Sequence, residues 1–253
     1  MKFIVDAACA CDIGKRRQNN EDNFFFGGKC LPAENSGLEH TLSFKESAKR
    51  GMTLAVFDGM GGENFGELAS YAAAKEMQSR EFRFADLFTK EEEYISRIVQ
   101  QLNDKVVEEE VRMRTNRMGT TMVALFFTSR HVLAANVGDS RAYRLREGEF
   151  TQLSYDHVDR FYAGKRKKAP LTQHLGIDPE YMYIEPHINK SQLQTGDWYL
   201  ICSDGLSDML SDGEIAAIIA QSSDARACAD KLLAEALERG GIDNTTIIVC
   251  KIS

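Results

Sequence analysis

Several strongly apolar stretches of this chain end abruptly in an acidic residue beside a turn residue. The clearest runs from Met52 to Phe57 and is followed at once by Asp58 and Gly59. A strand of this kind fixes a carboxylate in space, and the adjacent glycine lets backbone groups approach an ion or a ligand closely. Asp-Gly is also a common turn dipeptide. One such stretch therefore does not decide between a plain turn and a functional site.

The same pattern occurs four more times, with an acid at the end of an apolar strand and next to a glycine, an asparagine or a turn signal. These acids are Asp22, Asp139, Asp204 and Asp243. If the strand ends gather on one rim, four or five negative charges meet there, and they need cations. Oxygen ligands without His or Cys favour hard ions such as Mg²⁺ or Mn²⁺.

Paired hard cations indicate hydrolysis of a phosphate ester. Two such ions share a hydroxide that attacks phosphorus in line, and they neutralise the phosphoryl oxygens. Arg17 precedes Asp22 by five residues and has the fork of donors that clamps a phosphate bidentately. Glu21 and Asp22 precede the aromatic stretch 23–26, and two readings stay open for them. They lie on a solvated hairpin tip, or they start a buried strand, where a carboxylate needs a partner such as a metal ion or an arginine.

The composition limits the classes of function. The chain has 253 residues, 43% hydrophobic and 27% charged, which is typical of a soluble globular protein. The net charge of −7 argues against nucleic acid or an anionic membrane as the main partner. No apolar run approaches the ~20 residues that span a bilayer, and an acid at position 6 comes too early for a signal peptide. The six cysteines lack metal-binding spacing, which predicts reduced thiols and a cytoplasmic protein.

Periodicity predicts one α+β domain over residues 1–253. Helices are expected over 65–77, 91–114, 211–220 and 224–239, and Ser211 with Glu214 forms a capping box. Strands are expected over 3–11, 23–26, 52–57, 120–128, 131–137, 142–145, 150–153, 197–202 and 245–251, with a weaker signal over 181–188. The first two strands are expected to form a hairpin, residues 120–153 an antiparallel meander, and residues 29–50 an irregular surface excursion.

Residues 154–180 differ from the rest because the segment 160–168 is rich in lysine and arginine within an acidic chain. Glycine and proline mark its ends. Two readings stay open: a solvated loop, or a basic flap beside a site for an anionic substrate.

Six motifs carry a resemblance to a known family, in that family's order and across nearly the whole chain. They are residues 17–22 (RQNNED), 57–62 (FDGMGG), 119–121 (GTT), 136–141 (NVGDSR), 203–205 (SDG) and 243–246 (DNTT). By these motifs the chain resembles the PPM/PP2C family of metal-dependent Ser/Thr protein phosphatases in its bacterial form. The resemblance implies a PP2C-like, four-layer α/β/β/α sandwich of two antiparallel sheets flanked by helix pairs, with the metals at one end.

The resemblance also implies the main metal ligands. Asp58 would bridge two Mn²⁺ or Mg²⁺ ions and would be central to catalysis. The Gly59 carbonyl would bind one of these ions, and Asp204 and Asp243 would bind the other.

Four further residues receive roles by the same resemblance. Glu21 and Asp22 would act mostly through metal-bound waters. Asp139, with Asp204, would match the ligands of a weaker third ion. Arg17 would match the phosphate-binding arginine.

The chain departs from the family pattern at three places. Eukaryotic relatives have a histidine after Asp-Gly where this chain has Met60, as is usual in the bacterial form, so protonation of the leaving alkoxide would fall to a metal-bound water. Bacterial relatives often have a histidine after Gly-Gly, where this chain has Glu63 and Asn64. The flap is short and unusually basic, which bears most on the choice of substrate.

The expected substrate is therefore a phosphorylated protein, and family members of this kind commonly oppose a Ser/Thr kinase. Two alternatives stay open: a pseudophosphatase that binds phosphoproteins without turnover, and a metal hydrolase that acts on small phosphoesters. The complete set of acids favours the active phosphatase, since pseudophosphatases usually lose metal ligands. The sequence names neither the substrate, the kinase nor the oligomeric state.

Overall fold

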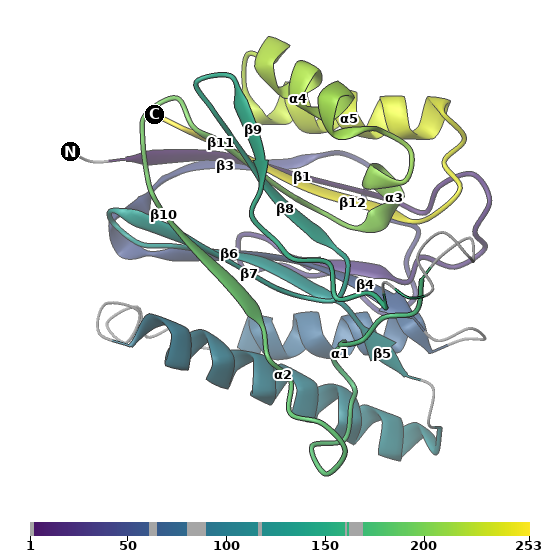
Figure 1. Ribbon diagram of the computed structural model, residues 1–253. Coiled ribbons are helices and arrows are strands. Elements are labelled where there is room, and N and C mark those ends of the chain that lie inside the picture. Colours follow the sequence, from purple (N-terminus) through teal and green to yellow (C-terminus); the bar gives the residue numbers. More distant parts are fainter. Residues whose placement is uncertain (1–2, 61–64, 80–89, 116–117, 160, 162–168) are drawn as a thin grey trace.

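The computed structural model describes residues 3–60, 65–79, 90–115, 118–159, 161 and 169–253. Two antiparallel sheets lie face to face, and a pair of helices covers the outer face of each (Figure 1). This arrangement confirms the predicted four-layer α/β/β/α sandwich. Each sheet is buried on both faces because it packs against the other sheet on one side and against helices on the other.

Sheet A has the strand order β3-β1-β12-β11-β8-β9. Its strands are β1 (Ile4–Asp12), β3 (Leu42–Ser47), β8 (Arg141–Arg146), β9 (Glu149–Gln152), β11 (Trp198–Cys202) and β12 (Thr245–Ile252). Sheet B has the order β10-β7-β6-β4-β2, and β5 pairs with β4 outside this path. Its strands are β2 (Asp22–Phe25), β4 (Met52–Met60), β5 (Gly119–Thr120), β6 (Met122–Phe127), β7 (His131–Val137) and β10 (His187–Gln192).

The helices form the two outer layers. The pair α1 (Gly66–Ser79) and α2 (Glu91–Met113) covers sheet B, and the pair α4 (Asp212–Gln221) and α5 (Ala225–Glu238) covers sheet A (Figure 1). A short helix, α3 (Asp204–Ser207), follows β11, and a 3-10 turn, Ala48–Arg50, precedes β4. The predicted capping box at the start of α4 is present, with both Ser211 and Glu214 engaged. No described helix is long and apolar enough to cross a bilayer.

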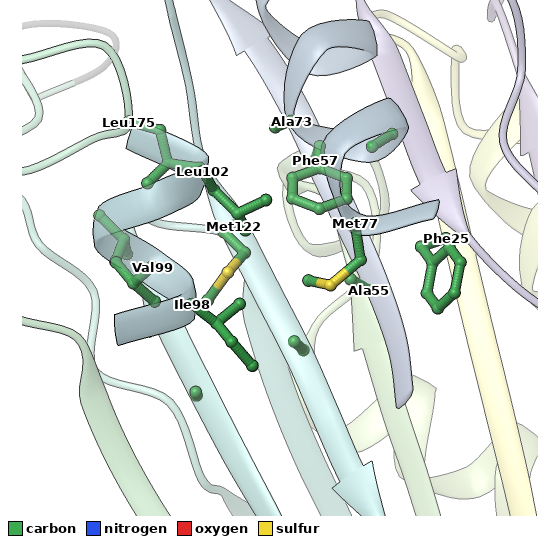
Figure 2. Close-up of a cluster of buried hydrophobic side chains, with 14 of the residues drawn as sticks. Phe25, Ala55, Phe57, Ala73, Met77, Ile98, Val99, Leu102, Met122 and Leu175 are labelled. Atoms are coloured by element: carbon green, nitrogen blue, oxygen red, sulfur yellow. The ribbon is translucent and has the colours of Figure 1, made fainter. Parts of the chain in front are cut away.

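The long helix α2 shows why the outer layers form. Its apolar stripe turns Ile98, Val99 and Leu102 toward sheet B, where Phe57 and Met122 lie (Figure 2). These side chains are at most 2% exposed. Burial of each contributes roughly 1.5–3 kcal/mol, so packing on the sheet stabilises the helix. All six cysteines are free of disulfides, as predicted, and five of them are buried.

Two predicted pairings were wrong, for one reason. β1 already has β12 and β3 on its two edges, so β2 joins β4 in sheet B instead of forming a hairpin. β7 likewise lies between β6 and β10, so the chain after it crosses to sheet A as β8 and no single meander forms. Both crossings bring polar loops, 13–21 and 138–140, to the same end of the sandwich.

Two edge strands were also misjudged. The segment predicted as irregular, 29–50, contains β3, whose half-exposed, polar sequence gives a weak strand signal. The weak signal at 181–188 was displaced, because β10 starts only at His187. Tyr181 and Tyr183 are 88% and 61% exposed, so the aromatic residues that suggested a strand do not belong to one.

Candidate metal and phosphate site

Asp58 lies at the end of β4, directly opposite Asp22 at the start of β2. The next residue, Gly59, donates its N–H to the carbonyl of Glu21 at 3.0 Å. A Cβ atom at Gly59 would lie 2.1 Å from the carbonyl oxygen of Gly66 and 2.5 Å from that of Glu21. Only glycine fits this close approach. Gly59 is therefore required by the close packing of three chain segments beside Asp58, beyond any need for a turn.

Thr121 holds the backbone of Asp58 in place. The Asp58 N–H donates to Thr121 Oγ1 at 3.1 Å, and the Thr121 N–H donates to the Asp58 carbonyl at 2.8 Å. Thr121 Oγ1 also shares a 2.6 Å hydrogen bond with Ser140 Oγ, which places the neighbouring Asp139 beside this strand end. Asp58 and Asp139 line one pocket of about 250 Å³, together with Met60, Thr121 and residues 169–171.

Asn244 joins the other acids to this centre. Its Oδ1 accepts the N–H of Glu21 at 2.8 Å, and its Nδ2 donates to the carbonyls of Ile13 and Asn19 at 2.9 Å. A Cβ atom at Gly205 would lie 2.0 Å from the Asn244 carbonyl oxygen. The backbones that carry Asp204, Asp243 and Glu21 are therefore adjacent.

Ser203 connects Asp22 to the last strand. Its Oγ donates to Asp22 Oδ2 at 2.7 Å and accepts the Thr246 N–H at 2.9 Å. Both Ser203 and Asp22 are essentially buried, and Asp204 follows directly as the first residue of α3. A buried carboxylate at this position is stabilised by such hydrogen bonds.

Arg17 is in contact with this group of acids. Its Nη2 donates to Asp243 Oδ2 at 2.7 Å, and its Nη1 lies 3.8 Å from Glu21 Oε2. Burial lowers the Arg17 pKa, but the hydrogen bond to Asp243 and the charges of Asp243, Glu21 and Asp58 outweigh it and raise that pKa. The pKa of Glu21 is raised mainly by burial and further by Glu67 and Asp243, while Arg17 opposes the shift. The rim is thus crowded with negative charge.

The donor set fits divalent cations. The predicted acids supply carboxylate oxygens, the Gly59 carbonyl supplies another, and hard ions prefer such ligands. In the described part of the chain, no three His, Cys, Asp or Glu side chains are grouped closely enough to hold an ion as they stand. The backbones that carry these acids are adjacent, so ligation would require rotation of their side chains.

Sequence reasoning did not assign a role to the residues that hold the acids. Three of them stand inside the quoted motifs, far along the chain from the acids they support: Thr121, Ser203 and Asn244. Their place inside a motif was the available signal, but it did not indicate which acid each would support. Glu63, Asn64 and the basic core of the flap at 162–168 lie outside the described residues.

Comparison with known proteins gives the family. Residues 40–238 match the family model described as protein phosphatase 2C. The chain is 30% identical to the serine/threonine phosphatase stp of Listeria innocua, across 94% of this chain and 92% of that protein. It is also 30% identical to the serine/threonine protein phosphatase PstP of Mycobacterium tuberculosis, across 99% of this chain and 45% of that protein.

A solved structure agrees with these sequence relationships. The catalytic domain of PstP in complex with two manganese ions superposes with a TM-score of 0.77 at 27% identity, across 99% of both chains. The family match, the two relatives and this structure cover the sandwich and the acidic rim together. The chain belongs to the protein phosphatase 2C family.

Proposed function

We propose that this protein is a metal-dependent phosphatase that removes phosphate from phosphoserine and phosphothreonine in proteins. One observation carries the proposal: the backbones that carry strand-end acids of both sheets lie together at one end of the sandwich, beside Arg17 and a pocket that Asp58 and Asp139 line. The relatives named serine/threonine phosphatases and the manganese-bound PstP structure support it.

Different residues of the rim would bind different metal ions. Asp58 and the Gly59 carbonyl would hold one ion, and Asp58, Asp204 and Asp243 would hold a second. Two Mn²⁺ or Mg²⁺ ions, when bound, supply Lewis acidity and ionise water at neutral pH. Asp139 with Asp204 would serve a third, weaker site.

Three other residues act around the ions. Glu21 and Asp22 would orient water, since Asp22 is fixed by Ser203 and the Glu21 backbone by Asn244. Arg17 would bind the phosphate of the substrate. Its side chain is 45% exposed, so the guanidinium is accessible to a ligand. A planar guanidinium binds two phosphate oxygens at once and orients the group for attack.

Met60 lines the same pocket but cannot donate a proton. The proton for the leaving alkoxide must therefore come from elsewhere in the site, and water is the candidate that needs no further side chain. The physiological partners would be phosphorylated proteins, which fits the names of the serine/threonine phosphatase relatives. We expect them to be a Ser/Thr kinase or its targets, and the free cysteines fit a bacterial cytoplasm.

The test is turnover of a phosphothreonine peptide and of p-nitrophenyl phosphate with added Mn²⁺. Asp58→Asn is expected to abolish both activities, and excess EDTA is expected to do the same to the wild type. Asp104→Asn, on the exposed face of α2, is the matched control and is expected to keep full activity. Full activity in EDTA would rule out the metal mechanism.

The two alternatives predict different results in the same assays. A pseudophosphatase would bind a phosphopeptide without turnover. A small-molecule hydrolase would turn over phosphorylated metabolites faster than phosphopeptides, at equal Mn²⁺. Comparison of kcat/KM on the two substrate classes separates all three.

A further inference from the structure

The turn that carries Asp139 is tightly constrained on the side of sheet B. Gly138 has a φ of +101°, a backbone conformation that residues with a side chain adopt only under strain. A Cβ added to Gly138 would also lie 2.6 Å from Thr121 Cγ2. Thr121 also contacts Asp58 and Ser140 through its hydroxyl. The turn therefore has one position relative to the bridging aspartate.

On its other side the same turn is held by His157, at the base of the flap. The His157 N–H donates to the Gly138 carbonyl at 3.0 Å, and the Gly138 N–H donates to His157 Nδ1 at 3.1 Å. The side chain is buried, with 8% exposure. Because Nδ1 accepts a hydrogen bond, the ring is neutral and carries its proton on Nε2.

Further hydrogen bonds fix the base of the flap around this pair. Asn136 Nδ2 donates to the carbonyls of Gly138 and Tyr155 at 3.2 and 2.8 Å, and Asn136 Oδ1 accepts the Tyr155 N–H at 3.0 Å. Arg141 Nη2 donates to Asp156 Oδ2 at 2.7 Å. The entry to the flap is thus tied to both strands that flank the Asp139 turn.

His157 also leads to the wall of the pocket. Its carbonyl accepts the Thr172 N–H at 2.8 Å, and the next residue, Val158, bridges to Leu171. Residues 169–171 line the pocket that Asp58 and Asp139 share. One residue therefore joins the two: the His157 ring binds the turn that carries Asp139, and the His157 backbone binds the flap next to the residues that line the pocket.

We infer that His157 is a positioning residue: its Nδ1 holds the Asp139 turn and its backbone holds the flap wall, so that the two keep one fixed relation and face the substrate together. This inference rests on the proposed phosphatase function and names a residue that sets the geometry of that site. A histidine that merely filled space would not need the acceptor at this ring position.

Two polar substitutions separate these cases. In His157→Asn the side-chain Oδ1 stands as many bonds from Cα as Nδ1 does, so it can accept the Gly138 N–H. In His157→Gln the oxygen is one bond further out and misses that position. We expect His157→Gln to lower kcat on the phosphothreonine peptide by about 10- to 100-fold, the usual loss when a hydrogen bond behind a ligand is removed. His157→Asn should stay within about threefold of wild type.

A second readout is independent of turnover. In metal-free protein, hydrogen exchange at the Gly138 amide should be slow in wild type and in His157→Asn, and faster in His157→Gln. His187→Gln is the matched control, since that ring is exposed on β10 and 6.0 Å from Tyr155; both kcat and Gly138 exchange should stay at the wild-type level.

Equal kcat and equal Gly138 exchange in the two His157 variants would overturn the inference. Loss of kcat in both variants, with protected Gly138 in His157→Asn, would also overturn it, because the acceptor would then not be the property that matters. An inactive wild type would instead refute the proposed function, and the exchange measurement would still decide the role of His157.

Discussion

Strand β11 has a buried aspartate at each end, and the surroundings of the two differ. Asp197 precedes the strand and is 1% exposed. It accepts hydrogen bonds from Arg146 Nε and Nη2 at 2.7 Å, from the Gln194 N–H at 2.9 Å and from the Tyr199 hydroxyl at 3.1 Å. A buried charge costs several kcal/mol unless it is compensated, and here the protein supplies the compensation itself.

Asp204 follows the same strand and is 5% exposed. It lies on the rim where acids from both sheets gather and where Arg17 binds Asp243. One strand therefore joins an acid that stabilises the fold to an acid that we assign to the proposed site. The difference teaches that burial of a carboxylate does not by itself identify a site; the residues that surround it have to be compared.

The largest effect is expected at Asp204, the aspartate on the acidic rim. Asp204→Asn should lower kcat on a phosphothreonine peptide by roughly 10³-fold, because loss of a metal ligand removes several kcal/mol of transition-state stabilisation. In EDTA the free energy of unfolding should change less than it does in Asp197→Asn, since the rim carries several like charges. Urea denaturation with and without Mn²⁺, beside the peptide assay, measures both. A large loss of stability in EDTA would make Asp204 a structural residue.

The opposite result is expected at the other end of the strand. Asp197→Asn should lower the free energy of unfolding by about 3–5 kcal/mol, because the Arg146 guanidinium is then left with no counter-charge in a buried pair. Activity per folded molecule should be retained at low temperature, where most of the chain stays folded. The measurement is urea denaturation monitored by tryptophan fluorescence. A free energy of unfolding equal to that of wild type would show that Asp197 does not stabilise the fold.

The sequence was sufficient to predict which acids lie at strand ends and, through the family resemblance, the four layers. Apolar strands that end in an acid are visible as a local pattern, and the apolar stripe of α2 is visible as a period of 3.6 residues. Both patterns depend on residues that are close together in the sequence, so they can be recognised without knowing which strands pair with one another. The choice between sheets after β1 and β7 was not predictable, because it depends on which strand edges are already occupied.

The residues that support the site were not predictable for a related reason. Asn244 accepts from Glu21, which lies 223 positions earlier. Ser203 donates to Asp22, 181 positions earlier. Polar side chains of this kind are common in turns, and nothing local to them indicates which distant backbone they will meet.

Asn244 allows that supporting role to be tested. Asn244→Ala removes one acceptor and two donors that hold the loop 13–21, so the Glu21 backbone loses its fixed position. We expect kcat to fall by about 10- to 100-fold with a smaller change in the free energy of unfolding than in Asp197→Asn. Peptide turnover at saturating Mn²⁺ and urea denaturation give the two values. A fall in stability without a fall in kcat would assign Asn244 to the fold alone.

The smallest effect concerns one buried and one half-buried histidine at the two ends of the flap, His157 and His174. Burial lowers the pKa of both below the ordinary value of 6.5; a second cause at His157 is the charge of His187, and at His174 a hydrogen bond to the Leu175 carbonyl opposes the shift.

Below pH 6.5 the unfolded chain therefore binds protons that the folded chain does not, so the free energy of unfolding falls as the pH is lowered. This contribution is complete above about pH 6.5 and is lost progressively as the pH approaches the lowered values. The double variant His157→Asn/His174→Asn should flatten the pH dependence of stability between pH 7 and 5, as about two titrating groups are removed. His40→Asn, at an exposed position, is the control. An unchanged slope in the double variant would mean that the flap ends are not held by neutral histidines, and that acid acts on the carboxylate rim instead.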